Sequence, residues 1–281
     1  MKSILTPVDQ IGRIYHFHNR ENIVDSLDSY MYHHHTFCEI YLFCDGDAEF
    51  IIEGSTYPIE KNDIMIIPPY KFHRPNPKLG KRFKRMVINI FPSFFYEMSC
   101  VDYMSIISRF ENVGYHIKNN IGKAYMLQDI IYSINQTFNN NYEQSNILPN
   151  LKIVELMYNL YLLLESKKLE NQTTQIYVND PIVSDTIHYI NQNYATITNV
   201  ASVASVFSYS PNYLNKIFKQ STGVTIPKYI NIKRFENIEN LFRAGSSLEA
   251  ASKLSGFNNY RHFAYAYKQE YGISPKMGMK F

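Results

Sequence analysis

The sequence predicts an α+β protein with an N-terminal β-barrel, a helical middle segment and a C-terminal domain built only of helices. Three observations predict this order. Short apolar or alternating runs separated by turn residues fill the chain to about residue 95, and helical periodicity replaces them from about residue 102. One pattern is then written twice, about 49 residues apart. We therefore place the domains at 1–100, 101–175 and 181–281.

The barrel is predicted from four short strands. Turn-prone pieces separate them, among them Asp45-Gly46-Asp47 and Lys61-Asn62. Many short strands at this spacing are typical of a small barrel or a jelly roll. The four runs are Glu39–Phe43, Ala48–Ile52, Asp63–Ile67 and Arg85–Ile90.

The helical middle segment, from about Asp102 to Leu169, carries a wide apolar stripe bounded by Lys and Glu. The stripe has two interpretations, which do not exclude each other: it packs against the chain's own barrel, or it forms the seam of a homodimer. A polar linker, Asn171–Gln175, follows it. The stripe contains Ile147, Leu148, Leu151, Val154, Leu156, Met157, Leu160, Tyr161, Leu163 and Leu164.

Composition and the lengths of the apolar runs limit the classes of protein to which this chain can belong. Of the 281 residues, 45% are hydrophobic and 19% charged, which is enough to bury a core and excludes a disordered chain. The N-terminus has no sustained apolar run, so no signal peptide is expected, and the apolar runs are too short to span a bilayer. Three cysteines without CxxC spacing, Cys38, Cys44 and Cys100, favour a reduced, cytoplasmic location.

Charge is unevenly distributed along the chain. Residues 181–281 hold 11 Lys and Arg against 5 Asp and Glu, whereas the rest of the chain holds 17 against 20. A basic C-terminal third beside a slightly acidic remainder suits a partner with a phosphate backbone, contacted at one end of the chain only.

The first copy of the repeated pattern predicts a helix-turn-helix element. Thr198 is placed to cap a short helix, and Ser210-Pro211 supplies the N-cap and first residue of the next one. Buried positions in this second helix are predicted at Leu214, Ile217 and Phe218. The outward positions are Asn212, Asn215, Lys216 and Lys219. Because Asn can pair with adenine and Lys with guanine or a phosphate, this face suits the major groove of DNA.

The second copy repeats this plan. Ser247 is the predicted cap, Leu248 and Leu254 are predicted to face the core, and Phe263 with Tyr267 should hold the second recognition helix in place. An amphipathic helix over 227–242 connects the copies and would keep the recognition helices at a fixed separation, as two major-groove faces about 34 Å apart require. The outward residues of the second recognition helix are Tyr260, Arg261, His262, Tyr265 and Lys268.

Residues 181–281 resemble the double helix-turn-helix domain of AraC/XylS-type transcriptional regulators. The resemblance implies that Asn212, Asn215 and Lys216 contact bases from the first helix, and Tyr260, Arg261 and Tyr265 from the second. Two features depart from the family pattern: Ala251-Ser252 stand where Ile-Ala is usual, and Tyr265 stands where Arg is common. The first unit is therefore predicted to be the main base reader. The matching positions are Phe218-Lys219, Gly223, Tyr229-Ile230, Arg234, Leu248, Gly256-Phe257, Phe263, Tyr267-Lys268, Gly272 and Ser274-Pro275.

A second cluster of polar residues lies in the predicted barrel. His33, His35 and Glu39 share one face of an extended segment by period-two alternation, and His73 follows a later strand. Their spacing resembles the two cupin motifs, although Asn62 and Tyr70 stand where glycine is expected. Three interpretations stay open: a metal-dependent enzyme, a sensor that hydrogen-bonds a small polar effector together with Tyr41, or an internal hydrogen-bonded cluster without chemistry.

Together these features and the resemblance predict a regulator rather than an enzyme: a cupin-like barrel binds a small-molecule effector, a helical segment dimerises, and the C-terminal domain binds double-stranded DNA. A carbohydrate effector suits the aromatic residues of the strands. The resemblance implies a cytoplasmic homodimer that activates transcription with RNA polymerase, without a membrane or a cofactor. No bound metal is expected, and His33, His35, Glu39 and His73 are the candidates if one binds. The alternatives are a metal-dependent cupin enzyme fused to a DNA-binding module, and a constitutive DNA-binding protein with a scaffold barrel.

Overall fold

The computed structural model describes residues 8–11, 15–97, 106–107, 109–110, 115–139, 147–168, 177–178 and 180–279. The chain divides into two compact units, residues 1–51 with 56–177 and residues 178–281 with 52–55. The linker predicted over 171–175 and the third cysteine, Cys100, lie outside the described residues. The domain limits 1–100, 101–175 and 181–281 stay a prediction.

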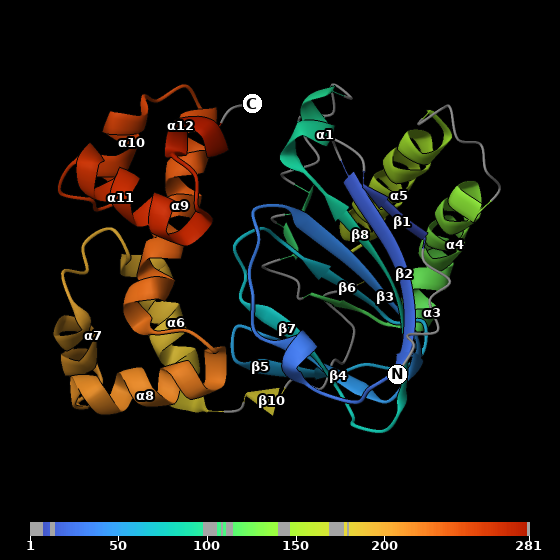
Figure 1. Cartoon of the computed structure of the whole chain (residues 1–281), viewed down its shortest axis with the longest axis horizontal. Coiled ribbons are helices and arrows are strands. Elements are labelled where there is room, and N and C mark those ends of the chain that lie inside the picture. The colour runs from blue at the N-terminus through green and yellow to red at the C-terminus, as the bar shows by residue number, and fades with distance from the viewer. Residues whose placement is uncertain are drawn as a thin grey trace. The chain divides into compact units, whose positions relative to one another are not determined.

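The N-terminal unit is built around two sheets (Figure 1). The first has six strands, in the order β1 (Val8–Ile11), β2 (Tyr15–Ile23), β8 (Arg82–Ile90), β3 (Cys38–Gly46), β6 (Ile64–Ile67) and β9 (His116–Ile117). The second has four, in the order β10 (Tyr177–Val178), β5 (Ser55–Pro58), β4 (Ala48–Ile52) and β7 (His73–Pro77). A short 3-10 helix, Asp28–Tyr30, precedes β3.

The four predicted strands are confirmed as β3, β4, β6 and β8, but the strands form two sheets and not one closed barrel. The sequence did not predict strand β2, because only Tyr15 and Phe17 alternate in it as buried apolar residues. From His18 to Asn22 the strand is polar on both faces, so a period-two hydrophobic pattern does not extend along it.

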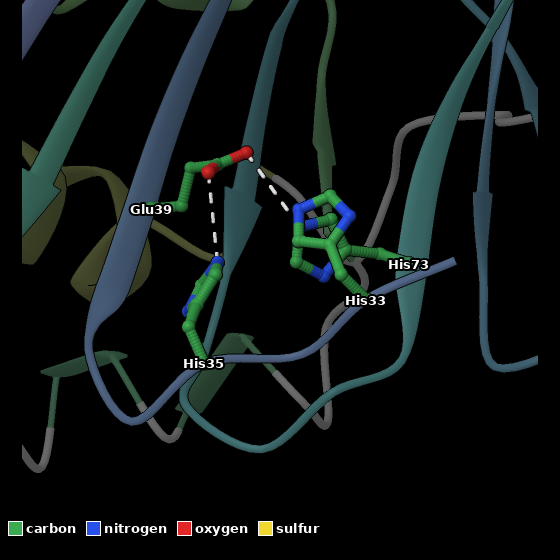
Figure 2. Close-up of side chains that lie close together, drawn as sticks. All are labelled: His33, His35, Glu39 and His73. Carbon is green, nitrogen blue, oxygen red and sulfur yellow. Dashed lines mark ion pairs between the residues drawn. The ribbon is translucent and has the colours of Figure 1, made fainter. Parts of the chain in front are cut away.

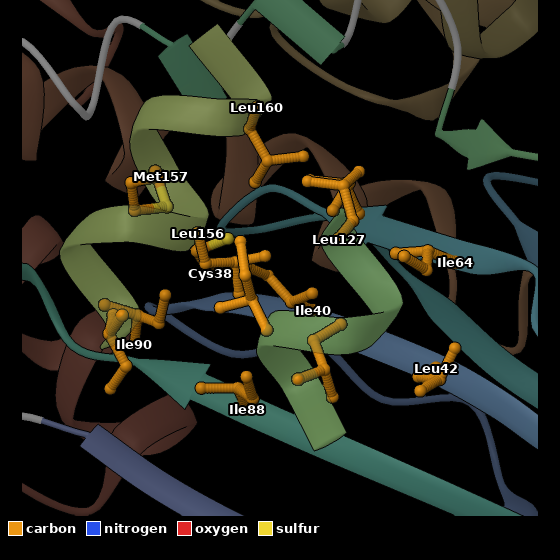
Figure 3. Close-up of a cluster of buried hydrophobic side chains, with 14 of the residues drawn as sticks. Cys38, Ile40, Leu42, Ile64, Ile88, Ile90, Leu127, Leu156, Met157 and Leu160 are labelled. Atoms are coloured by element: carbon orange, nitrogen blue, oxygen red, sulfur yellow. The ribbon is translucent and has the colours of Figure 1, made fainter. Parts of the chain in front are cut away.

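Helices cover one face of the six-stranded sheet (Figures 1 and 3). Strand β3 is buried on both faces: its even-numbered residues, such as Cys38 and Ile40, join the core under α4 (Leu127–Asn139) and α5 (Ile147–Glu165). Its odd-numbered residues, such as Glu39 and Tyr41, point to the opposite face. Two short helices, α1 (Pro92–Glu97) and α3 (Asn119–Ala124), also belong to this unit.

Helix α5 has two apolar faces. The inner one packs on the sheet and is fully or almost fully buried, and it contains Ile153, Leu156, Met157, Leu160, Leu163 and Leu164. The outer one is exposed and contains Ile147, Leu148, Leu151, Tyr158, Tyr161 and Leu162. Part of the predicted stripe therefore packs against its own unit, whereas its residues Ile147, Leu148, Leu151 and Tyr161 lie on the exposed face.

The expectation that every apolar run is too short to span a membrane does not hold for α5. Its 19 residues are long and apolar enough by length and composition alone. A buried core helix passes the same test, and the packed inner face of α5 fits that explanation.

The C-terminal unit contains seven helices among the described residues (Figure 1). They are α6 (Pro181–Asn193), α7 (Val200–Val206), α8 (Pro211–Thr222), α9 (Ile226–Arg243), α10 (Leu248–Leu254), α11 (Tyr260–Tyr271) and α12 (Pro275–Gly278). Helix α9 is the predicted connector, and α8 and α11 are the predicted recognition helices.

Side-chain caps define where these helices begin. The predicted caps Ser210 and Ser247 are confirmed, because their hydroxyls accept the backbone N–H groups of Tyr213 and Ala250. The predicted cap Thr198 is wrong by one position: the Asn199 side chain accepts from Ser202 N. Both residues can cap, so the sequence alone does not separate them.

The connector α9 ties the two halves of this unit together. Buried Arg234 donates to the carbonyl oxygens of Tyr194 and Ile197 at 3.0 and 2.6 Å. Gly256, with φ +94°, approaches the same segment so closely that a Cβ would lie 2.2 Å from the Ala195 oxygen. Residues 194–197 are thus contacted both by the connector α9 and by the turn at Gly256 in the second half.

The core around α10 differs from the prediction at one position. Ala251 and Ser252 are fully buried, and the Ser252 hydroxyl donates to the Glu249 carbonyl. Leu254, predicted to face the core, is 63% exposed. The helix is only seven residues long, so its buried face is already filled near its centre and its last turn projects outward.

Candidate functional sites

Four polar side chains converge inside the N-terminal unit (Figure 2). One ligand-type atom from each of His33, His35, Glu39 and His73 lies within 4.8 Å of the others. Glu39 pairs with His35 Nε2 at 3.5 Å and with His73 Nε2 at 3.7 Å. His73 is fully buried, whereas His33 is exposed, so the cluster extends from the interior to solvent. The structure thus brings together the four residues that the sequence had grouped.

Backbone hydrogen bonds hold the two segments of this cluster against each other. His33 and His73 exchange N–H to carbonyl bonds of 3.1 and 3.0 Å, as an isolated antiparallel bridge. Tyr70 N donates to the His35 carbonyl at 2.8 Å. The imidazole rings of His33 and His73 lie 4.3 Å apart as a result.

Each of the three imidazoles uses the same ring nitrogen for a hydrogen bond to the backbone. His33 Nδ1 lies 3.0 Å from Met31 O, His35 Nδ1 lies 2.7 Å from Phe37 O, and His73 Nδ1 lies 2.8 Å from Lys71 O. A carbonyl oxygen can only accept, so each Nδ1 carries the proton. The other ring nitrogen, Nε2, lies near Glu39 in both His35 and His73.

Burial and proximity set the charges of this cluster. Burial lowers the pKa of His73 to about 3, so its ring is neutral near pH 7. Burial alone would raise the pKa of Glu39, but a hydrogen bond from His35 and the positive charge that His73, His35 and His33 carry when protonated outweigh it and lower the pKa to about 2. A carboxylate therefore faces a neutral, buried imidazole.

The predicted effector residue Tyr41 lies on the same face of β3 as Glu39. Its hydroxyl is buried and makes no hydrogen bond within the part of the chain that the structure describes. Burial raises the pKa of Tyr41 well above its usual value, so the hydroxyl stays protonated. Its ring contacts Phe50 of β4 edge to face at 5.0 Å. Tyr41 therefore offers an unused hydrogen bond in the interior.

Several interior polar residues were missed in the sequence. The strand register places Glu39 opposite Asn89, and Asn89 opposite His16; in the next row Tyr41 and His18 flank Val87. Paired residues share one face of a sheet, so His16, His18 and Asn89 belong to the same interior face as Glu39. The alternation of His16, His18, Arg20 and Asn22 is the signal that could have revealed this face.

Helix α8 presents a polar outer face. Asn212, Lys216 and Lys219 are exposed, and they fall on one side of the helix by their spacing. Tyr213 is exposed as well and stacks on Tyr209, with ring centroids 5.3 Å apart. Leu214 and Phe218 are fully buried, as predicted, whereas Ile217, also predicted to be buried, is only half-buried. The sequence missed Tyr213, which sits between the predicted polar positions.

Asn215, predicted to face DNA, also has a role within the domain. Its Oδ1 accepts the backbone N–H of Ile226 at 2.8 Å, at the first residue of α9. Its side chain is only partly exposed. Because the first N–H groups of a helix have no partner inside the helix, Asn215 acts as a cap supplied by a neighbouring helix.

Helix α11 follows the same plan with different surface residues. Arg261, His262, Tyr265 and Lys268 are exposed, and Tyr265 reaches 66% exposure. Tyr260 is half-buried and packs on Phe263 at 5.8 Å, so only part of it is available to a partner. Phe263 and Tyr267 are buried as predicted.

Comparison with protein families gives two matches. A family described as "AraC-like ligand binding domain" matches residues 25–98, which include His33, His35, Glu39, Tyr41 and His73. A family described as "Helix-turn-helix domain" matches residues 203–278, which include α8 and α11.

Similar proteins were found in both sequence and structure comparisons. An uncharacterized HTH-type transcriptional regulator in the cgkA 5' region of Pseudoalteromonas carrageenovora is 32% identical over 111 residues, which are 40% of this chain and 66% of that protein. The HTH-type transcriptional activator RhaS of Enterobacter sp. (strain 638) is 22% identical over 245 residues, 87% of this chain and 85% of the relative. The crystal structure of ToxT from Vibrio cholerae aligns over 95% of this chain and 98% of its own at 13% identity, with a TM-score of 0.37.

Proposed function

Because this chain is an AraC-type transcriptional regulator, with an AraC-like ligand-binding domain and an AraC-type helix-turn-helix domain, we propose that a small polar effector in its N-terminal unit controls how α8 and α11 engage DNA. The matched families and the named relatives are those of transcriptional regulators and not of enzymes. They give no support to the alternative of a metal-dependent enzyme fused to a DNA-binding module.

The observation that supports this proposal most strongly is the pair of capped helices. Both α8 and α11 begin at a side-chain cap and end at a left-handed glycine, Gly223 or Gly272, and both bury an apolar face. Their outer faces carry the residues that suit base edges and phosphates. We propose that Asn212, Lys216, Arg261 and Tyr265 contact bases and that Lys219 and Lys268 contact the DNA backbone.

A direct test measures specific binding by fluorescence anisotropy on DNA from upstream of the chain's own gene, after footprinting has located the site. The double variant Lys216→Ala/Arg261→Ala should lose most sequence discrimination, because it removes a base contact from each helix. Lys253→Ala is the matched control, since Lys253 is an exposed lysine of α10 outside both recognition helices. Equal loss in the control and the double variant would contradict the proposed surface.

The effector is proposed to bind in the interior of the N-terminal unit. His33, His35, Glu39, Tyr41 and His73 supply polar groups there, beside aromatic rings such as Phe50. Such a mixture suits a small polar molecule, with carbohydrates as the first class to screen. A thermal shift screen should give hits that Tyr41→Phe weakens, because that change removes only the buried hydroxyl. A chain without any hit would instead fit constitutive DNA binding.

The outer face of α5 supports the proposal of a homodimer. Its exposed residues include Leu148, Leu151 and Tyr158, and they form an apolar surface along one helix. Leu151→Asp should shift the chain toward monomers in sedimentation velocity. Met31→Asp is the control, because Met31 is 66% exposed but lies outside α5. A monomeric wild-type chain that binds lipid vesicles through this face would contradict the dimer.

Activation of transcription with RNA polymerase in the cytoplasm completes the proposal. It follows the name of the RhaS relative, which is an activator, and the basic charge of residues 181–281. A reporter fused to the footprinted promoter should rise on expression of the chain. A fall in reporter signal would indicate repression.

A further inference from the structure

We propose that Tyr213 of α8, held in place by Tyr209, packs against the C5 methyl group of a thymine in the major groove of the operator. The inference rests on the proposed function, because it adds a specificity-determining contact to the DNA-binding surface described above. Neither tyrosine is among the residues that the sequence analysis assigned to DNA.

The exposed face of α8 is wider than the sequence predicted. Successive residues of an α-helix are turned by about 100° around its axis, which gives the order of the side chains around α8. Asn215 lies beyond one edge of the exposed face, where its side chain caps α9, and Tyr213 lies within the opposite edge. The exposed residues, in order around the helix, are Lys219, Asn212, Lys216, Gln220 and Tyr213.

The charge of this face fits DNA as the partner of Tyr213. Helix α8 contains two lysines and no acidic residue, and both lysines are exposed. Lysines can neutralise phosphates while an aromatic ring beside them meets an apolar group on a base edge. In the major groove, the C5 methyl group of thymine is the apolar feature by which a base pair is recognised. The Tyr213 ring therefore indicates a thymine.

The backbone fixes Tyr209 beside Tyr213. At the end of α7, Tyr209 N donates to the Ala204 carbonyl at 3.1 Å. Ser208 N donates to the Ser205 carbonyl at 3.3 Å, which completes a Schellman motif. Ser208 has the left-handed conformation of this motif, with φ +59°, although it is not a glycine. The rings of Tyr209 and Tyr213 stack with their planes 27° apart, so the Tyr213 ring is oriented before DNA binds.

The second half of the domain shows that the fold does not require an exposed ring at this position. The same motif ends α10, where Phe257 N donates to the Ser252 carbonyl at 3.0 Å, so Phe257 corresponds to Tyr209. Phe257 is buried, whereas Tyr209 and Tyr213 are 42% and 50% exposed. An apolar residue at this position ordinarily packs on its own helix. The exposed, stacked pair therefore points to a partner outside the chain.

The test measures operator affinity by fluorescence anisotropy at fixed salt. Each thymine of the footprinted site is replaced in turn by deoxyuridine, which lacks only the C5 methyl group. Wild type should lose about four-fold in affinity at one thymine, as expected for one buried methyl group. Tyr213→Ala should bind the intact operator about five-fold more weakly and show no further loss at that deoxyuridine. Tyr213→Phe should behave as wild type, because it keeps the ring.

The positioning role of Tyr209 has a separate readout. Tyr209→Ala should reduce the effect of deoxyuridine at the same thymine, and Tyr209→Phe should restore it, because phenylalanine keeps the stacked ring. Leu254→Ala is the matched control, since Leu254 is a large apolar residue that is 63% exposed but lies in α10, outside both recognition helices. This control should bind both operators as wild type does.

The outcomes separate this inference from the proposed function. It is overturned if wild type and Tyr213→Ala respond alike to deoxyuridine at every thymine, or if Tyr213→Phe loses as much affinity as Tyr213→Ala. An equal loss in Leu254→Ala would overturn it as well. Both tyrosines are exposed, so their variants should keep the wild-type melting temperature. A wild-type chain without specific operator binding would instead contradict the proposed function.

Discussion

The two recognition helices, α8 and α11, share their buried frame but differ in their exposed residues. The caps Ser210 and Asn259 lie 49 positions apart, and the same offset relates Leu214 to Phe263 and Phe218 to Tyr267. On the outer faces, Asn212 corresponds to Arg261 and Lys216 to Tyr265. The buried positions are therefore apolar in both helices, while two of the exposed positions available to DNA carry different side chains.

The cores behind the two helices also differ. Phe218 of α8 contacts Tyr229 edge to face at 5.4 Å. Phe263 of α11 belongs to a larger aromatic cluster that includes Phe235, Phe257 and Tyr267. The second half is thus held by more aromatic packing, and its predicted base readers are two tyrosines and an arginine in place of two asparagines and a lysine.

The largest expected effect comes from breaking each core in turn. Phe218→Ala and Phe263→Ala both remove a fully buried ring, and each should cost about 3–5 kcal/mol of stability by urea denaturation. Because α8 is the predicted main reader, Phe218→Ala should abolish specific DNA binding, while Phe263→Ala should leave a measurable remainder. The reverse order would make α11 the main reader.

Single substitutions at the surface test whether α8 or α11 contributes more to base recognition. Lys216→Ala and Arg261→Ala should each weaken specific binding by about 1–3 kcal/mol if they contact bases, with the larger loss for Lys216. The measurement is operator affinity at fixed salt, repeated with each base pair of the site replaced. If neither variant changes affinity, the assignment of recognition helices is wrong.

Asn215 has no counterpart in α11, where Ala264 occupies the same position. Asn215→Ala removes the acceptor for Ile226 N, and we expect a loss of about 1 kcal/mol in stability, as for other lost caps. Thermal unfolding should show this loss while base preferences stay unchanged. A changed preference at one base pair with unchanged stability would instead make Asn215 a base reader.

The smallest expected difference concerns the lysines at the last turns. Lys219→Ala and Lys268→Ala should each lower the salt slope of binding by about 1 and weaken all DNA sequences alike. The comparison is made by titrating salt with operator and with unrelated DNA. A loss confined to the operator would show that the lysine reads bases.

Local signals in the sequence predicted much of the C-terminal unit. Ser210-Pro211 and Gly223 specify the ends of α8 without reference to the rest of the chain, because a cap, a proline and a glycine act on neighbouring backbone groups. Leu254 and the cap at Asn199 were wrong, since burial at a helix end and the choice between adjacent cap residues depend on surrounding packing. The second role of Asn215 depends on where α9 starts in space.

The N-terminal cluster was predicted by residue type but not by geometry. Alternation grouped His33, His35 and Glu39, and the structure added His73 as predicted. The bridge between His33 and His73 could not be predicted, because it joins segments that are distant in the sequence, whereas the hydrogen bond of each Nδ1 is local, to a carbonyl two residues away. The interior residue Asn89 was missed for the same reason: only strand register places it opposite Glu39.

The buried contacts to residues 194–197 limit the spacing of the DNA sites that this regulator can bind. Arg234 of the connector α9 and Gly256 of the second half both contact this segment, so the distance between α8 and α11 is set by buried contacts. Inserting one base pair between the two contacted stretches would rotate one of them by about a tenth of a turn around the duplex. The protein should bind such an operator poorly even though every contacted base is present. A change in operator spacing would therefore require a change in the buried contacts that set the distance between α8 and α11.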